Sequence, residues 1–346
     1  MSPLPRLRRQ LDRLAIVMMS AIGDAVHVLP VVTALKRHRP GCRITWFLAA
    51  GPASLVRGHP DVDEIVVFSG RGGAREWMRL RERLRGRTFD IVLDFQVALK
   101  AGLLTAMVDA PVKLGFDRRR ARDMNWLFTT ERIAPRANQH VQDQYFEFLE
   151  HLGVPSQPVE WKLGPWDHEA ALMRDVLDST DRPIVSIAIS SARLGRNWPA
   201  ERWADVINAI QERHGLRAML VGGRSEQELA AERIIMERVR ERPVSTLGCS
   251  LRELVALIRG SALVMTPDTA PLHIAVALRV PVIGLFGMTD PRRTGPYRAS
   301  HDLIVDAFRN PSDGDRIIVE KRSGRMERIT VEDVLAKVAL WHRTRR

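Results

Sequence analysis

The chain has 346 residues, of which 45% are hydrophobic and 27% charged, proportions that indicate a globular protein and exclude a disordered or fibrous one. Its length suits two domains, and none of its apolar runs is long enough to span a bilayer. The net charge of +12 favours polyanionic partners such as anionic lipid, phosphorylated glycan or nucleic acid. Two cysteines make neither a disulfide framework nor a zinc pattern, so a reducing cytoplasm is expected.

Strand-like apolar runs alternate with helix-like segments in the first part of the chain. Strands are predicted at 13–19, 42–49, 64–68 and 89–95, and helices at 24–38 and in the arginine-rich run 71–87. Pro30 lies inside the first helical pattern, so a kink or a late start is expected there. Every fourth residue of the arginine-rich run is an arginine: Arg75, Arg79 and Arg83. They share a helix face that is either simply solvated or contacts an anionic partner. No zinc-finger spacing or RNP-like motif favours nucleic acid.

Residues 153–168 interrupt the alternation with three prolines and two glycines, which predicts a linker between domains. After it, strands are predicted at 184–189, 217–221, 262–265 and 280–286, and helices at 199–213, 225–240, 251–258, 271–278 and 330–341. Gly215 is expected to end the first of these helices. Alternating strands and helices predict parallel sheets. The expected fold is α/β, with Rossmann-like domains at 1–160 and 161–346 facing one cleft, and with the final helix able to pack back on the first domain.

Ligands of open parallel sheets bind beyond the carboxyl ends of the strands, and polar segments follow the predicted strands at three places. The first is SAIGDAVH, residues 20–27, where Gly23 allows a tight turn and Asp24 is either an N-cap or a functional carboxylate. The second, SSARLGRNWP, contains Arg196, and an arginine can bind phosphate with two hydrogen bonds. The first segment lacks G-x-G-x-x-G, and the chain lacks G-x-x-x-x-G-K-[ST]. A dehydrogenase or a P-loop NTPase is therefore not expected.

The third segment, MTPDTAPLHIAVALRVPVIGLFGMTDPRRTGPY from Met265, places two polar clusters directly after two strands. Asp268, Thr269 and Ala270 lie between the first strand and its helix. The N–H groups and the dipole at such a helix start form an anion site. Asp268 would cap the helix or accept a hydroxyl hydrogen bond, and His273 is either a structural histidine or part of the site. The second cluster, residues 288–295, is expected to form a neighbouring wall.

These segments resemble a known family. DTAPLHIAVALRVPVIGLFGMTDPRRTGPY is similar to the signature of the lipopolysaccharide heptosyltransferases, glycosyltransferase family 9, which have the GT-B fold. RLAIVMMSAIGDAVHVLPVVTALKRHRPGCRITWFL resembles the N-terminal segment of that family, with its pattern S-x-x-G-D-x-x-H-x-L-P. SARLGRNWPAERWADVI and VGGRSEQELA resemble the intermediate blocks, in the same order. The resemblance covers most of the chain.

The resemblance implies that the first domain binds the acceptor and the second an ADP-activated sugar. It makes Asp24 the general base and places three further residues in the acceptor site: Ser20, Gly23 and His27. It assigns the donor to six residues: Arg196, Glu226, Asp268, Thr269, Ala270 and His273. Arg196 stands where the family commonly has a lysine that contacts phosphate, and Glu226 where a carboxylate contacts the ribose. Ala270 stands where glycine is common, which requires a negative φ.

The implied reaction moves heptose from ADP-L-glycero-D-manno-heptose to a hydroxyl of the lipopolysaccharide inner core, with inversion and without cofactor or metal. The expected partners are this donor, this acceptor and, transiently, an anionic membrane surface at the inner face of the inner membrane. Arg75, Arg79 and Arg83 would contact the acceptor and that surface. Two alternatives stay open. One is a family-9 transferase with another donor or glycan acceptor, and the other is a non-catalytic GT-B protein that binds glycan.

Overall fold

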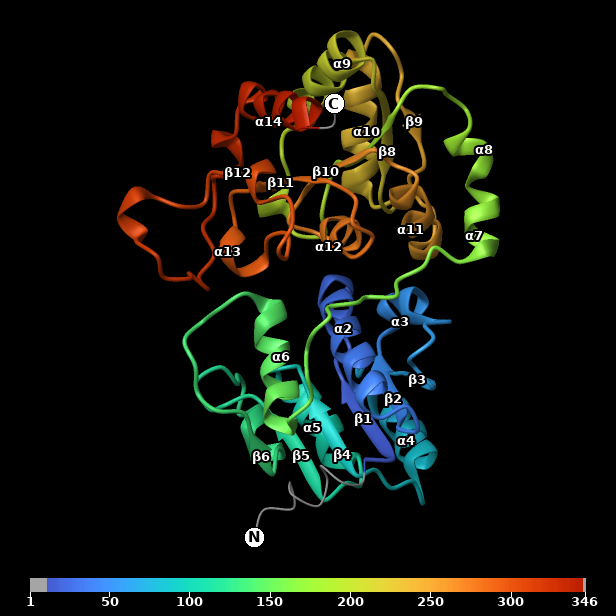
Figure 1. The fold of residues 1–346 in the computed structure, drawn as a ribbon, viewed down its shortest axis with the longest axis vertical. Helices are drawn as coiled ribbons and strands as arrows, with labels where there is room; N and C mark the ends of the chain where they lie inside the picture. The colour runs from blue at the N-terminus through green and yellow to red at the C-terminus, as the bar shows by residue number, and fades with distance from the viewer. Residues whose placement is uncertain (1–10, 345–346) are drawn as a thin grey trace. The chain divides into compact units, whose positions relative to one another are not determined.

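The computed structural model describes residues 11–344, which divide into two compact α/β units (Figure 1). Within the described residues, the first unit runs to Ala137 and resumes at Val141–Lys162. The second unit contains Asn138–His140 and continues from Leu163. The change of unit after Lys162 falls inside the segment predicted as a linker, two residues beyond the predicted boundary.

The first unit is built on a parallel sheet of six strands in the order β3-β2-β1-β4-β5-β6. The strands are β1 Arg13–Val17, β2 Arg43–Leu48, β3 Glu64–Val67, β4 Ile91–Asp94, β5 Val112–Gly115 and β6 Glu131–Arg132. β1 pairs with β2 on one side and with β4 on the other, so the order of the strands reverses between β1 and β4. This switch point is where an open α/β sheet binds its ligands.

The helices of the first unit connect these strands (Figure 1). They are α2 Ile22–His38, α3 Ala50–Val56, α4 Gly73–Leu84, α5 Leu99–Met107, η1 Asn125–Phe128 and α6 Val141–Leu152. The expected late start of the first helix is wrong, because α2 begins two residues before Asp24 and continues through Pro30 without interruption. Residues 25–35 of α2 are all buried. A helix buried on every side has a weak apolar period, which is why its start is hard to place from sequence.

The second unit repeats the arrangement, with a parallel sheet in the order β12-β11-β10-β7-β8-β9. Its strands are β7 Ile184–Ala188, β8 Arg217–Val221, β9 Val244–Ser245, β10 Leu263–Pro267, β11 Val282–Phe286 and β12 Ile304–Asp306. β7 and β10 are neighbours, and the strand order reverses between them. The second switch point therefore lies between the ends of β7 and β10.

Of the helices of the second unit, five lie close to their predicted positions and three, at 167–172, 174–177 and 291–294, were not predicted. The helices are α7 Asp167–Leu172, α8 Arg174–Leu177, α9 Ala200–His214, α10 Glu226–Arg238, α11 Leu251–Arg259, α12 Ala270–Ala277, α13 Pro291–Thr294 and α14 Val331–Thr344, with 3-10 turns η2 Leu194–Arg196, η3 His301–Leu303, η4 Pro311–Asp313 and η5 Met326–Arg328. Gly215 ends α9 with φ 61°, as predicted for a glycine at that place. Ser225 and Ser250 cap α10 and α11, each in a capping box with a glutamate three residues later.

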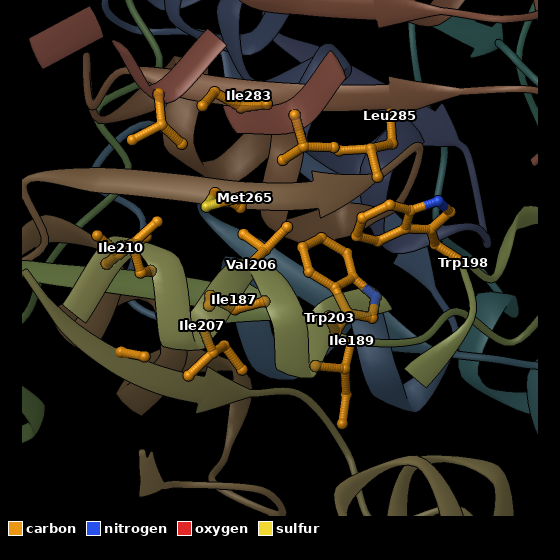
Figure 2. Close-up of a cluster of buried hydrophobic side chains, with 14 of the residues drawn as sticks. Ile187, Ile189, Trp198, Trp203, Val206, Ile207, Ile210, Met265, Ile283 and Leu285 are labelled. Carbon is orange, nitrogen blue, oxygen red and sulfur yellow. The ribbon is translucent and has the colours of Figure 1, made fainter. Parts of the chain in front are cut away.

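The core of the second unit packs one face of α9 against the sheet (Figure 2). Trp198 and Trp203 meet edge to face with their ring centroids 4.8 Å apart, a favoured aromatic geometry. Figure 2 shows Val206 and Ile210 of α9 beside Met265 of β10. The arrangement holds the strands whose ends carry the site residues.

The final helix, α14, is part of this second unit. Val334, Val338 and Trp341 are buried in the same core, and α14 packs along α9. The helix thus buries its apolar face against the second unit, to which it belongs. The sequence analysis had left open that it packs on the first domain instead.

Candidate active site

Arg196 and Asp268 meet at the switch point of the second unit. Arg196 ends η2 after β7, and Asp268 directly follows β10. Arg196 Nη1 donates to the Asp268 carbonyl oxygen at 2.5 Å, and Nη2 lies 3.1 Å from Asp268 Oδ2. Two of the five guanidinium N–H groups are thereby used, and Nε is buried with no hydrogen-bond partner in the described part of the chain. The pair fixes a cation at the edge of the sheet and leaves one N–H on each η nitrogen to bind an anion.

The Asp268 carboxylate is buried and surrounded by donors. Thr289 and Thr294 donate hydroxyl hydrogen bonds to Oδ2 at 2.6 and 3.1 Å, and His273 Nε2 lies 3.7 Å from Oδ1. Burial opposes ionisation of this carboxyl, but the hydrogen bond from His273 and the charge of Arg196 outweigh it and lower the pKa of Asp268 to about 2. Asp268 is therefore ionised at neutral pH, and both of its oxygens have partners inside the unit.

The start of α12 lies directly after Asp268. Thr269 is the N-cap residue, its side chain makes no capping hydrogen bond, and both Thr269 and Ala270 are half-buried. The first N–H groups of a helix have no carbonyl partner within the helix, and the dipole adds positive charge at this end. Ala270 adopts the helical conformation, so the negative φ required there is present. The start of α12 and the Arg196 guanidinium together present donors suited to a diphosphate.

Glu226 lies at the same edge of the second sheet, since it opens α10 after β8, the neighbour of β7. Its side chain is exposed. The nearby Glu228 turns back instead, with Oε1 accepting from Gly223 N–H at 2.7 Å and Oε2 from Ser225 N–H at 2.9 Å. Glu228 thus shapes the loop, and the exposed Glu226 lies beside it.

In the first unit, Asp24 lies beyond the carboxyl end of β1. It is the third residue of α2 and half-buried, and Ala21 N–H donates to its Oδ2 at 2.9 Å. Tyr145 Oη donates to Oδ1 at 3.3 Å. One oxygen therefore reaches back to the helix start, as in a capping box, and the other is oriented by a tyrosine from α6. This geometry holds a carboxylate with a fixed orientation at the switch point of the first unit.

Gln96 fixes the loop that leads to Asp24. It follows β4, and its Oε1 accepts from Met19 N–H at 3.0 Å while its Nε2 donates to the Ser20 carbonyl oxygen at 2.8 Å. The side chain thereby bridges the ends of β1 and β4 across the first switch point. Asp94, the last residue of β4, accepts from Gln96 N–H at 3.1 Å and holds this bridge in turn.

The second unit thus offers an anion site and the first a positioned carboxylate, each at a switch point, and comparison with known proteins identifies the family. The family model described as glycosyltransferase family 9 (heptosyltransferase) matches residues 77–315, more than half of the chain. This chain belongs to glycosyltransferase family 9.

A Haemophilus influenzae protein named lipopolysaccharide core heptosyltransferase OpsX is 30% identical to it over 296 residues, which cover 85% of this chain and 84% of that protein. A Pseudomonas aeruginosa lipopolysaccharide heptosyltransferase 1 is 27% identical over 308 residues, covering 86% and 84%. The family-9 chain is accordingly a glycosyltransferase, as predicted.

Solved structures agree on the fold. A family-9 glycosyltransferase from Veillonella parvula superposes with a TM-score of 0.82 at 22% identity, covering 96% of this chain and 98% of that one. The E. coli heptosyltransferase WaaC, solved with ADP, gives a TM-score of 0.75 at 23% identity, covering 95% and 99%. The α/β, GT-B class predicted from the sequence is confirmed for this glycosyltransferase.

Two residues predicted for the acceptor site have internal roles in this glycosyltransferase. His27 is 4% exposed, its Nδ1 lies 3.1 Å from Gln142 Oε1, and Gln142 Nε2 donates to the His27 carbonyl oxygen at 2.8 Å. His27 thereby joins α2 to α6, whereas the sequence analysis expected it to contact the acceptor. Gly23 lies within the first turn of α2 in helical conformation, so the expected tight turn is absent there. Ser20 is exposed, as a substrate contact requires.

The structure places Arg83 of α4 away from Asp24. Arg83 pairs with Glu64, the first residue of β3, at 3.1 Å and so lies at the amino end of the sheet. Asp24 lies at the opposite, carboxyl end. Arg75 and Arg79 are exposed on the outer face of α4. A role for all three in one acceptor site is therefore not supported by their placement.

Two Asp-x-Asp sequences, the pattern of metal-dependent transferases, occur in the chain at 61–63 and 313–315. Asp61 binds Lys162 at 2.9 Å, and Asp63 binds Lys36 at 2.8 Å. Asp313 accepts from both η nitrogens of Arg322. Among residues 11–344, no group of three or more His, Cys, Asp and Glu side chains is arranged to hold a metal ion. Both sequences are thus occupied by ion pairs.

The sequence analysis did not identify the partners that position the site: Thr289, Thr294, Gln96 and Tyr145. The two threonines belong to the polar cluster after β11, which was predicted only as a neighbouring wall. Gln96 is the first polar residue after β4, and side chains that line a switch point can be sought at such positions in the sequence. Tyr145 had no sequence signal, since it reaches Asp24 from 121 residues away.

Proposed function

We propose that this family-9 glycosyltransferase transfers heptose from ADP-heptose to a hydroxyl of the lipopolysaccharide inner core, with inversion at the anomeric carbon. The observation that carries the proposal is the Arg196–Asp268 pair at the uncapped start of α12, an anion site at a switch point. The name of the H. influenzae relative, a lipopolysaccharide core heptosyltransferase, supports the acceptor. The solved E. coli enzyme with ADP supports the nucleotide.

Loss of the sugar leaves extra negative charge on the diphosphate of ADP. The N–H groups at Thr269 and Ala270 and the guanidinium of Arg196 stabilise that charge because they are already oriented before the bond breaks. Asp268 fixes Arg196 and does not itself contact the donor. Glu226 binds the nucleotide ribose from the start of α10. With this cationic site the reaction proceeds without a metal ion or other cofactor.

Asp24 of the first unit takes the proton from the acceptor hydroxyl as it attacks the anomeric carbon. Its carboxylate is held by Ala21 N–H and Tyr145 Oη, so its lone pairs have a fixed direction. Ser20 contacts the acceptor beside it. Displacement of ADP from the face opposite the attacking hydroxyl inverts the configuration.

The acceptor is part of a lipid, so the enzyme works at the cytoplasmic face of the inner membrane as a peripheral protein. None of the helices among residues 11–344 combines the length and the hydropathy of a membrane span.

The test is a donor and acceptor screen with the purified chain. ADP-heptose, other ADP-sugars, GDP-sugars and UDP-sugars are each offered with lipopolysaccharide truncated at successive core positions, in the presence of EDTA. Heptose transfer from ADP-heptose alone, with one new anomeric configuration by NMR, is the expected result. Transfer from a different nucleotide sugar would replace this donor assignment, and donor binding without any transfer would indicate a non-catalytic glycan-binding protein.

A further inference from the structure

Four large apolar side chains of the first unit are exposed on α5 and η1. The exposed fractions are 43% for Leu99, 41% for Leu103, 60% for Met124 and 55% for Leu127. Leu99 and Leu103 are one turn apart on α5, and Met124 and Leu127 lie at the start and within η1. These four residues are called the apolar patch below. Scattered single apolar residues are normal on a surface, but a gathered set indicates an interaction site.

The two halves of the patch belong to one surface, because η1 is fastened along α5. Phe128 packs so closely on Gly102 that a Cβ atom there would lie 2.4 Å from its ring. Asn125 Nδ2 donates to the Ala98 carbonyl oxygen at 3.1 Å, and Arg122 N–H donates to the Val97 carbonyl oxygen at 2.9 Å.

The direction of the leucines follows from the helix period. Ala101, Leu104 and Val108 are buried in the core of the first unit. At 100° per residue, Leu99 and Leu103 lie on the opposite side of α5, and Gly102, which carries η1, lies between the two sides. The exposed leucines therefore flank η1 on the outer surface.

A rim of basic residues borders the patch on the η1 side. Arg118, Arg119 and Arg122 are exposed in the loop before η1. The Arg118 guanidinium lies 3.9 Å from the ring centroid of Trp126 in η1, and Arg132 Nη2 donates to the Trp126 carbonyl oxygen at 2.9 Å. Residues 113–136 contain seven basic and three acidic side chains. Arg120 and Arg136 are paired with carboxylates, and the exposed arginines before η1 make the rim cationic.

We infer that the apolar patch and its arginine rim form a docking surface for an anionic phospholipid bilayer. Apolar side chains at the centre enter the boundary between headgroups and acyl chains, and the arginines around them bind anionic headgroups. The centre of a protein–protein interface is also poor in charged residues, but such an interface does not require a strongly cationic rim. The inference deepens the proposed function and rests on it in one premise, that the acceptor is a membrane lipid.

The docking surface is tied to the acceptor side of the first unit. Asn125 of η1 also donates to Asp94 Oδ2 at 3.0 Å, at the carboxyl end of β4. Gln96, two residues later, holds Met19 and Ser20, which precede Asp24. A bilayer bound at η1 is thus connected through three residues to the loop that positions the general base.

The test is sedimentation of the full chain with vesicles, without donor or acceptor. One set contains phosphatidylethanolamine and phosphatidylglycerol, the other phosphatidylcholine alone. The variants are Leu103→Glu, Leu127→Glu and the pair Arg119→Gln with Arg122→Gln. Met78→Glu and Leu172→Glu are matched controls, because these side chains are also exposed, at 61% and 51%, but lie outside the patch.

The wild type is expected to bind the anionic vesicles more tightly than the neutral ones. Each glutamate in the patch should weaken that binding at least roughly tenfold, because a charge replaces an inserted leucine. The arginine pair should remove most of the preference for anionic lipid. Both controls should stay within about twofold of wild type, and all variants should keep the wild-type melting temperature.

Three results would overturn the inference: no vesicle binding by the wild type, an equal loss in the controls, or unchanged vesicle binding together with dissociation of a dimer in the patch variants. Transfer to a short water-soluble core acceptor, measured in parallel, separates the two proposals. If the wild type binds vesicles as expected and transfers nothing, the proposed function fails and the docking surface stands.

Discussion

Arg196 Nη2 and Asp268 Oδ2 lie 3.1 Å apart at the reversal point of the second sheet, and Arg196 also donates to the Asp268 backbone carbonyl. The contact joins the loop after β7 to the end of β10, 72 residues away in the chain. A long cationic side chain is thereby held beside the start of α12 before any ligand arrives. Preorganisation of this kind is what a site for a departing diphosphate needs.

Removing the Asp268 charge should destabilise the second unit. Asp268→Asn leaves Arg196 without its buried counter-charge, so the free energy of unfolding should fall by roughly 2–4 kcal/mol. Urea denaturation at pH 7 measures it. Arg240→Ala, which breaks the exposed pair with Glu212, is the control and should change stability by less than about 1 kcal/mol. An Asp268→Asn protein as stable as wild type would contradict a buried, ionised Asp268.

The same carboxyl predicts acid sensitivity. Its pKa is lowered from 3.8 to about 2 in the folded state, so the stability it contributes is complete above about pH 4 and is lost as the pH falls towards 2. The Asp268→Asn variant should lack this component of the decline in unfolding free energy between pH 4 and pH 2. Equal acid slopes for the two proteins would show that another carboxyl is responsible.

Arg196 should determine affinity for the nucleotide. Arg196→Ala should weaken ADP binding by roughly 10- to 100-fold in calorimetry, the effect of losing a charge-assisted hydrogen bond. Arg196→Lys keeps the charge but cannot bond the carbonyl and the carboxylate of Asp268 in a fixed fork. Its affinity for ADP should therefore lie between those of the wild type and the alanine variant. Lysine as weak as alanine would mean that geometry alone matters, and unchanged affinity in both would remove Arg196 from the donor site.

Asp24→Asn should lower turnover at least about 100-fold, the lower end of general-base effects, while ADP affinity stays within about twofold. Asparagine cannot accept the proton, yet it can still receive the Ala21 N–H, so the start of α2 should be preserved. Tyr145→Phe removes only the orienting hydrogen bond and should cost less. Wild-type turnover in the asparagine variant would exclude Asp24 as the base.

Gln96 should act as a positioning residue for the same loop. Gln96→Leu removes the bonds to Met19 and Ser20 and should lower turnover by roughly 10- to 100-fold through misplacement of Asp24. Restoration of most activity by Gln96→Asn is not expected, because the shorter side chain does not span the gap between the strand ends. The KM for ADP-heptose should not move. A selective rise in that KM would place Gln96 in donor binding instead.

Asp94 predicts a second, opposite dependence on pH. Burial raises the pKa of its carboxyl from 3.8 to about 7, although Asn125, Thr105 and Gln96 N–H donate to it. The folded state then holds the proton more tightly than the unfolded state. Stability from this group is therefore complete below about pH 4 and is lost as the pH rises through 7.

The variant that isolates the effect is Asp94→Asn, which should flatten the change in unfolding free energy between pH 4 and pH 8. The wild-type change from this group is at most on the order of 4 kcal/mol. Asp123→Asn, an exposed carboxyl, is the control and should leave the slope unaltered. A wild-type slope in the Asp94→Asn protein would show that this carboxyl does not titrate in that range.

Much of the fold could be predicted because buried parallel strands are continuous apolar runs. β8 has the predicted bounds, and β7, β10 and β2 differ from prediction by two residues or fewer at each end. Residues 99–152 were not predicted at all. α5 is apolar on nearly every side and β5 has four residues, so neither has a period to detect. The docking surface proposed above lies in that segment.

For the site, the sequence alone showed which residues follow the ends of predicted strands: Asp24, Arg196, Glu226 and the segment from Asp268. A carboxyl end is a position along the chain, so the sequence can show it. Only the tertiary structure decided that Asp268 is enclosed by Thr289 and Thr294, that Gln96 supports the loop before Asp24, and that His27 faces α6. Those contacts depend on which strands are neighbours and which helix faces meet. Strand order in a parallel sheet is set by packing over the whole domain, and no local pattern of residues records it.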